Sequence, residues 1–347
     1  MPQRTVAITL ANATTIVAMV VALIVAWYAR DVLLLAFAGV LLAVFFRTIA
    51  RWLHERTGVP VSVALAGVVL FLVGGVIASL WLRGPTIGAE LDALRDGIPR
   101  AVEAVKGRLQ ASDIGRRLLE QMPSPQEALP DARSAVSQAT GVVSLTFGAL
   151  TTFVVVLFLG IIFAATPRPY VSGVLALVPV RKEARAREVL QRLEDTLWWW
   201  VVGRVLSMVV IGVATGVGLW LLDVPLAFIL ALIAALLTFI PNIGPLLAAL
   251  PAVLLGLAQS SRVALYVVLL YAGVQAVETY VMSPIVDRKT VAIPPALTVI
   301  AQLLLVMVAG ILGAALASPL AAAMLVLVNM LYVHDVLGRP DADQPSA

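Results

Sequence analysis

The sequence contains no cysteine and few charged or histidine side chains. Of its 347 residues, 13% are charged, two are histidine and none is cysteine. The lack of cysteine excludes disulfide frameworks and thiolate metal sites. There is no glycine-rich loop followed by lysine and serine or threonine, so ATP-driven chemistry is not expected. No His-Glu-x-x-His motif, catalytic triad or pair of catalytic carboxylates can be assembled. We therefore expect neither an enzyme nor a cofactor or metal site.

The apolar content is correspondingly high. Hydrophobic residues make up 61% of the chain, and the mean hydropathy is +1.01. Soluble domains are about half apolar and about a quarter charged, so the composition predicts an all-helical, polytopic membrane protein. A helix needs about 20 apolar residues to cross a bilayer. Runs of that kind predict about five to six full spans: Ile8–Tyr28, Val32–Ile49, Val61–Leu82, Val142–Ala165, Trp199–Leu222 and Val263–Met282.

Two more polar segments divide the chain into regions. Between residues 83 and 141, Ile87, Leu91, Leu94 and Ile98 recur every three or four positions, which is typical of one face of an amphipathic helix. We expect both polar segments to lie on the membrane surface or to cap the helical bundle, with ligand binding as the alternative. The predicted regions are N-terminal spans (1–82), an extracytoplasmic amphipathic helical region (83–141), a span (142–165), a cytoplasmic amphipathic helical loop (166–198), a core (199–336) and a disordered tail (337–347).

The positions of lysine and arginine predict the orientation in the membrane. The net charge is +4, and the basic residues lie in short loops, which indicates membrane topology rather than nucleic-acid binding. Three basic clusters fall on one side if the N-terminus is inside and if each broken segment described below returns to the side it entered from. This predicts that both termini lie in the cytoplasm. The clusters are Arg47, Arg51 and Arg56; Arg181 to Arg192; and Arg288 with Lys289. Tryptophans should mark the outer ends (Trp27, Trp81, Trp220) and one inner end (Trp198, Trp199, Trp200).

Two long apolar segments, 226–259 and 294–333, are interrupted by glycine and proline. A shift of 69 positions lays Gly244 of the first on Gly313 of the second. The first break is Pro241 to Pro245, and the second is Gly310 to Gly313 followed by Ser318-Pro319. In lipid, broken helices persist only where protein or a water-filled cavity covers them. Paired breaks of this kind point to a transporter's substrate site. The arms could be re-entrant hairpins or tilted spans, and their opposite orientations predict an inverted repeat.

Several polar side chains fall inside predicted spans. Glu278 is an acid near the end of the span Val263–Met282, so it is a candidate proton or ion carrier; the alternative is a structural pair with Arg288 or Lys289. Asn242 is either a binding group or a turn residue. Arg204 is expected to extend to the inner interface, and Gln302 and Asn329 to join helices. The predicted solute or ion pathway comprises Pro241, Asn242, Gly244, Pro245, Gln275, Glu278, Gly310, Gly313 and Pro319.

In combination, these motifs resemble one known family. They are Val202-Gly203-Arg204, the run Phe239 to Pro245 with Pro251, Gln275 with Glu278, Pro284-Ile285, Pro294-Pro295, and Gly310 to Pro319. With them the chain resembles, over nearly its whole length, the autoinducer-2 exporter (AI-2E) family, also called the PerM-like permease family. The resemblance implies transport, either of a small signalling sugar derivative or of sodium and protons, and a homo-oligomer. The loop Val286-Asp287-Arg288-Lys289 lacks a glycine that family members usually carry, so ligand or ion details do not transfer through it.

We therefore expect a secondary transporter that exports a small polar solute or signalling molecule by alternating access, coupled to an ion gradient. Its partners would be that solute, a proton or sodium ion, the lipid bilayer and further copies of the chain. The main alternative is a sodium/proton antiporter that uses Glu278. A second alternative, from a different class, is a non-transporting membrane scaffold whose outer region binds a partner.

Overall fold

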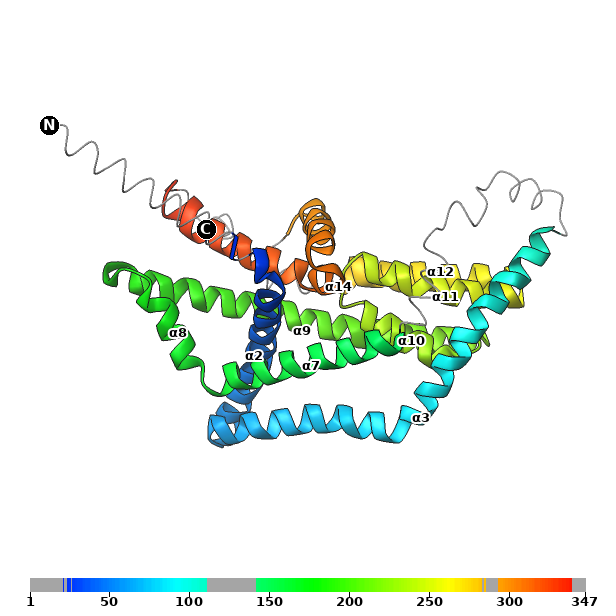
Figure 1. Ribbon diagram of the computed structural model, residues 1–347, viewed down its shortest axis with the longest axis horizontal. Helices are drawn as coiled ribbons and strands as arrows, with labels where there is room; N and C mark the ends of the chain where they lie inside the picture. Colours follow the sequence, from blue (N-terminus) through cyan, green and yellow to red (C-terminus); the bar gives the residue numbers. More distant parts are fainter. Residues whose placement is uncertain are drawn as a thin grey trace.

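The structure, a computed structural model, describes residues 27–110, 142–282 and 293–338, together with Val21, Ile24, Val25 and Pro284. Most of the predicted span Ile8–Tyr28, the basic pair Arg288 and Lys289, and most of the tail 337–347 lie outside these residues. The described residues form helices and no strand, which confirms the all-helical prediction (Figure 1). The helices are α2 (Arg30–Thr57), α3 (Val61–Gln110), α7 (Val142–Ala165), α8 (Pro167–Ala176), η1 (Val180–Lys182), α9 (Glu183–Leu221), α10 (Ala227–Leu237), α11 (Ile243–Gln259), α12 (Ser261–Val277), η2 (Glu278–Met282), α14 (Pro295–Leu327) and η3 (Val328–His334).

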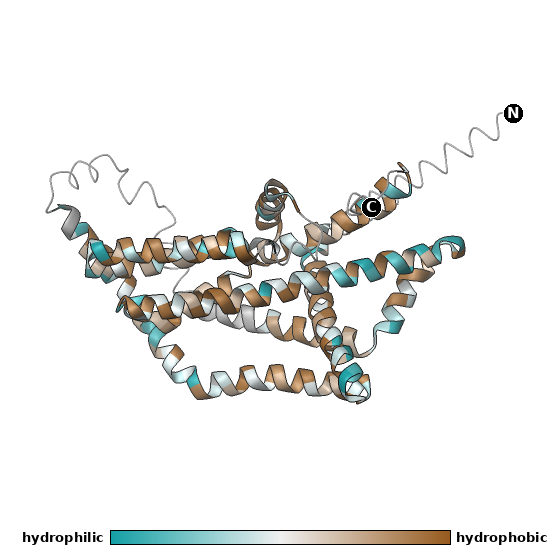
Figure 2. Cartoon of the chain, turned by 180° about the vertical axis from the view of Figure 1, so that it is seen from behind, coloured by the Kyte–Doolittle hydropathy of each residue, from teal (hydrophilic) through white to brown (hydrophobic). Residues whose placement is uncertain are grey.

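The long helices are apolar enough to cross a membrane. Five described segments pass on length and composition, and there are up to six if α7 and α8, bent by 80° at Thr166, count as one broken span. This confirms the prediction of five to six spans. Apolar residues run along these helices on the surface as well as inside (Figure 2), and Trp81 and Met307 are among the exposed side chains. Such a surface is expected where lipid, not water, surrounds the helices.

Helix boundaries agree with the sequence at one span and differ at two others. The helix α7 begins and ends at the predicted residues, Val142 and Ala165. By contrast, α3 continues past Leu82 to Gln110 and changes direction on the way, as expected for a helix that contains Pro85 and Pro99. The amphipathic stretch before residue 198 and the predicted span after it form one 39-residue helix, α9. The helix runs on because a change from polar to apolar residues does not break a helix, and α9 contains no proline to interrupt it.

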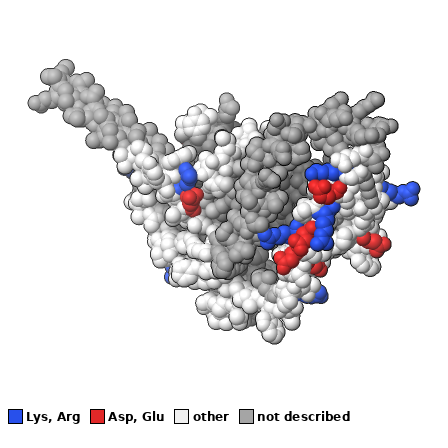
Figure 3. Space-filling model, turned by 45° about the vertical axis from the view of Figure 1, so that its right-hand side comes forward, with Lys and Arg blue, Asp and Glu red and all other residues white. Residues whose placement is uncertain are grey.

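The second half of α3 packs against the core. Leu94 and Ala101 are buried in one cluster with Ile229 of α10 and Leu255 of α11. The Glu90 carboxylate accepts a hydrogen bond of 3.1 Å from the backbone N–H of Ile229. Ile229 lies in the first turn of α10, where N–H groups lack helical partners and a negative charge is favourable. The apolar face of this half therefore packs on the helical bundle. Acidic and basic side chains gather on the surface of the molecule where the second half of α3 lies (Figure 3).

Long-range contacts define two ends of the molecule. At one end, Arg51 of α2 pairs with Glu194 of α9, and Arg185 pairs with Asp335 at 2.9 Å. The pair of Arg51 with Glu194 brings the basic cluster of Arg47, Arg51 and Arg56 next to the helix that carries the cluster from Arg181 to Arg192, as the charge pattern predicts. At the other end, the Gln259 side chain donates a hydrogen bond of 3.0 Å to the carbonyl of Asp223. The chain therefore enters α10 and leaves α11 at the same end.

Candidate functional site

The first break is a helical hairpin. Because Asp223 and Gln259 meet, α10 and α11 fold back on each other around residues 238–242. Asn242 precedes α11 with φ of +65°, its side chain makes no capping hydrogen bond, and it is exposed. Of the two roles predicted for Asn242, this geometry fits the turn residue, because asparagine adopts a positive φ more readily than most residues. Whether the exposed amide also meets a solute stays a prediction.

Glycines at the two breaks serve the same steric purpose. A Cβ on Gly244 would lie 1.7 Å from the carbonyl oxygen of Leu237, and one on Gly313 would lie 2.0 Å from that of Leu305. Both contacts are with backbone, which cannot rotate away as a side chain can. The 69-residue correspondence seen in the sequence is therefore matched in three dimensions.

The second break is narrower than predicted. Within α14, Ala309 has non-helical torsions and Gly310 has φ of +60°, which separates an arm of residues 295–308 from an arm beginning at Ile311. The prediction of a further interruption at Ser318-Pro319 is wrong, because both residues are buried inside the second arm with helical torsions. Neighbouring protein can cover the backbone group that a buried proline leaves unpaired, and the change of direction has already occurred at Gly310.

A buried ion pair lies beside the first break. The guanidinium of Arg204 in α9 lies 3.0 Å from the carboxylate of Glu278, and the two side chains are only 15% and 10% exposed. Glu278 opens η2, a π-helical turn at the end of α12. π-turns inside helices occur frequently at functional sites. Residues 74 positions apart thus place opposite charges together inside the bundle.

Three further groups hold this pair. The Gln275 amide donates to the second carboxylate oxygen of Glu278 at 3.2 Å. Arg204 also donates to the carbonyl of Thr238, 3.1 Å away at the C-terminus of α10, where carbonyls lack helical partners and a positive charge is favourable. The Trp200 ring lies 5.9 Å from the guanidinium. The pair is therefore tied directly to the backbone of the broken segment.

The second broken segment contacts the first break through Gln302. Its side-chain N–H donates a 2.7 Å hydrogen bond to the carbonyl of Pro241, in the first break. Gln302 is 1% exposed, and its side-chain oxygen has no hydrogen-bond partner within the described part of the chain. Phe239, next to the first break, and Ala309, in the second, pack against one cluster of buried side chains. The two breaks therefore meet inside the bundle, and one buried acceptor there is open to a donor.

That cluster, the central apolar cluster, contains Leu34, Leu41, Leu197, Trp200, Val201 and Leu316. It covers one side of the ion pair. Along α9, Leu197 precedes Arg204 by seven positions, which is about 10 Å of helix. Along α14, Leu316 follows the break at Gly310 by less than two turns. Through Trp200, apolar side chains from three helices therefore pack next to the pair.

The sequence also matches a known protein family. The model of the AI-2E family transporters matches residues 16–332.

The chain belongs to the AI-2E transporter family. It is similar to "Putative transport protein YrrI" of Bacillus subtilis (strain 168), 25% identical over 290 residues that cover 81% of each chain. It is also similar to "Putative transport protein YueF" of the same organism, 26% identical over 311 residues, covering 86% of this chain and 82% of the relative. A third relative, "Putative transport protein MT0215" of Mycobacterium tuberculosis (strain CDC 1551 / Oshkosh), is 28% identical over 280 residues.

Within this family member, the structure brings together only part of the predicted pathway. Glu278, Gln275 and Pro241 converge on one site. Pro245 is half-buried in the first turn of α11, and Pro319 is fully buried in α14; both lie in helices. Among the described residues, no group of three or more histidine or acidic side chains is placed to hold a metal ion.

Two residues at the site were misread from the sequence. Arg204 does not extend to the interface but pairs with Glu278, and Trp200 is buried instead of marking the inner end of a span. The structural partners proposed for Glu278, Arg288 and Lys289, lie outside the described residues. A signal for the pair was present: each charge lies inside a predicted span, and an intramembrane charge needs a partner of opposite sign.

Proposed function

We propose that this chain is a secondary transporter that exports a small polar solute or signalling molecule by alternating access, coupled to an ion gradient across the bacterial inner membrane. The observation that carries the proposal is the buried pair of Arg204 and Glu278, held against the first break. Charges are costly inside a membrane and commonly mark ion or substrate pathways. A scaffold would need neither this pair nor two broken segments.

The contacts suggest how an ion couples to movement. A proton or sodium ion that neutralises Glu278 removes the main attraction on Arg204. The guanidinium is then held by the Thr238 carbonyl and the Trp200 ring. Thr238 ends α10, so a shift of Arg204 changes the support of the first broken segment. A polar solute would meet the unpaired Gln302 oxygen where the two breaks join. Packing of the central apolar cluster next to the ion pair fits one state of an alternating cycle.

A sodium/proton antiporter is the second candidate. It is favoured by two oxygen ligands that both accept hydrogen bonds from Arg204, the Glu278 carboxylate and the Thr238 carbonyl: a small cation that displaced the guanidinium would find both. Under this alternative no organic solute moves, and Glu278 exchanges a proton for sodium.

Flux measurements separate the candidates. The purified protein should be reconstituted in proteoliposomes and given sodium, proton and autoinducer-2 gradients, first singly and then in combination. Under the main proposal, autoinducer-2 or another small polar solute moves, and an imposed ion gradient accelerates it. Sodium-dependent proton movement without any solute supports the antiporter. If no gradient produces movement of solute, sodium or protons, both candidates are wrong.

The topology prediction can be tested on the cysteine-free background. Single cysteines at Asp96 of α3 and Arg262 of α12 should react with an impermeant thiol reagent from outside the cell, and a cysteine at Lys182 should react only after the membrane is opened. All three side chains are exposed. The reason is that the first broken segment returns to the end it entered from, while lysine and arginine clusters stay inside. Opposite labelling of Asp96→Cys and Arg262→Cys would contradict the hairpin topology.

A further inference from the structure

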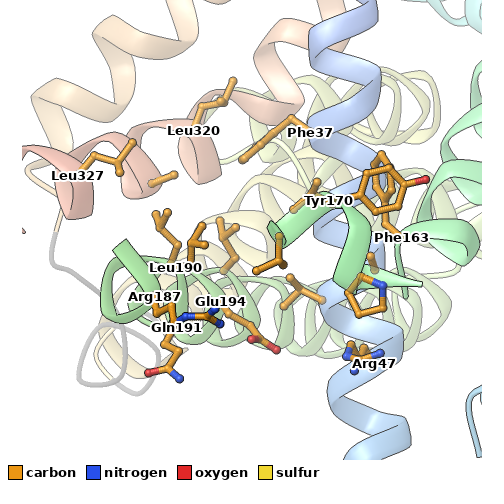
Figure 4. Close-up of a pocket in the computed structure, with 18 of the residues that line it drawn as sticks. Phe37, Arg47, Phe163, Tyr170, Arg187, Leu190, Gln191, Glu194, Leu320 and Leu327 are labelled. Carbon is orange, nitrogen blue, oxygen red and sulfur yellow. The ribbon is translucent and has the colours of Figure 1, made fainter. Parts of the chain in front are cut away.

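A cavity of about 650 Å³ lies beside the central apolar cluster (Figure 4), and neither Arg204 nor Glu278 lines it. It is enclosed by α2, the end of α7 with α8, the first half of α9 and the second arm of α14. Leu197 and Leu320 line it and also belong to or pack against the central apolar cluster. The cavity is therefore separate from the Arg204–Glu278 site, and no predicted pathway residue lines it.

One side of the cavity is apolar and open. Phe37, Leu320 and Leu327 lie together above the polar residues in Figure 4. Met324 of α14, which also lines the cavity, is 61% exposed. Exposed apolar side chains on membrane-spanning helices face hydrocarbon. This side therefore opens toward acyl chains.

The opposite side is basic. Arg47, Arg187 and Glu194 line it. Arg51 pairs with Glu194, and Arg187 pairs with Glu183. Among the described residues, Arg47 forms no ion pair; its guanidinium donates to the Ala164 carbonyl at 2.8 Å, and Arg51, Glu194 and Arg168 lie within electrostatic range of it. Of the four arginines here, the carboxylates of Glu194 and Glu183 balance only Arg51 and Arg187. Arg47 and Arg168 therefore leave an excess of positive charge.

We propose that this cavity binds one anionic phospholipid. Its phosphate would lie at Arg47, which lines the cavity, with Arg168 beside it, next to the lining residue Pro167; an acyl chain would lie against Phe37, Leu320 and Met324. Guanidinium groups suit phosphate because they donate paired hydrogen bonds in a plane. Basic pockets between membrane helices on the cytoplasmic side are typical anionic-lipid sites. The lipid would bridge α2, α8, α9 and α14 beside the central apolar cluster.

The test counts bound lipid and does not depend on transport. The full-length protein, purified in detergent and stripped of lipid, is titrated with phosphatidylglycerol or phosphatidylcholine, and native mass spectrometry counts the lipids retained. We expect one phosphatidylglycerol per chain at a concentration about tenfold below that needed for phosphatidylcholine. Arg168→Gln, at an exposed side chain, should raise the half-saturating phosphatidylglycerol concentration about tenfold, the value of one charged hydrogen bond.

Ala323→Trp, which fills the cavity from α14, should abolish tight binding. Leu303→Trp, at an exposed position of α14 outside the cavity, is the matched control and should bind as the unmodified protein does. If Ala323→Trp does not fold, Ala323→Cys replaces it: phosphatidylglycerol but not phosphatidylcholine should slow its reaction with a maleimide. Equal retention of the two lipids, or unchanged binding in the filled variant, overturns the proposal. The proposal is also overturned if Ala323→Trp keeps its bound lipid but no longer forms oligomers, because the occupant of the cavity would then be a second copy of the chain.

Discussion

Replacing either break glycine, Gly244 or Gly313, by alanine is expected to abolish transport, and valine should prevent native packing altogether. The added Cβ would lie 1.7 Å from the Leu237 oxygen or 2.0 Å from the Leu305 oxygen. Overpacking in a well-packed interior typically costs about 1–3 kcal/mol. Here the contact is with backbone, so the two arms of the break must separate. Flux in proteoliposomes and the thermal unfolding temperature of the purified variants would measure both effects.

Gly273→Ala in α12 and Gly74→Ala in α3 are the matched controls. A Cβ at either position meets no atom within 4 Å. Alanine favours a helix over glycine by up to about 1 kcal/mol, so these variants should be at least as stable as the unmodified protein and should retain flux. If Gly244→Ala behaves like Gly273→Ala, the close approach of the arms is not needed for transport.

The second large effect is expected from the ion pair. Arg204→Met leaves the Glu278 carboxylate buried without its partner, and loss of one member of a buried pair costs about 3–5 kcal/mol. The double variant Arg204→Met with Glu278→Met should recover most of this loss, because two apolar side chains replace two charges. Transport coupled to the ion gradient should nevertheless remain absent. The unfolding temperature and the flux of Arg204→Met, Glu278→Met and the double variant, with the unmodified protein, give a complete double-mutant cycle.

Glu278→Gln separates coupling from structure. Its amide oxygen can still accept a hydrogen bond from Arg204 but cannot take up a proton or balance the charge. We expect insertion into the membrane with reduced thermal stability, and flux that no longer responds to pH or sodium. An active variant with an unaltered pH and sodium profile would rule out the coupling role. Lys106→Met, which breaks an exposed pair with Glu103 on α3, is the control and should change little, because exposed pairs contribute little to stability.

Local chemistry by itself determined the class of the protein and the positions of its breaks. Apolar runs of sufficient length form membrane-spanning helices wherever they occur, so α7 has the predicted bounds. Glycine and proline act on the torsions of their own segment, so the interruptions at Pro241–Gly244 and Gly310 could be read directly. The equivalence of Gly244 and Gly313 was visible for the same reason. Resemblance to the AI-2E family likewise rested on short motifs and is confirmed by the match to residues 16–332.

Only the tertiary structure decided which groups meet. Sequence patterns report helix faces and ends, but they carry no distance between segments far apart in the chain. The pairing of Arg204 with Glu278, the hydrogen bond from Gln302 to Pro241 and the burial of Trp200 all depend on how α9, α12 and α14 pack around the first break. The cavity beside the central apolar cluster depends on five helices at once. Inside a bundle, a charge is stable only beside a partner, and packing decides which partner is within reach.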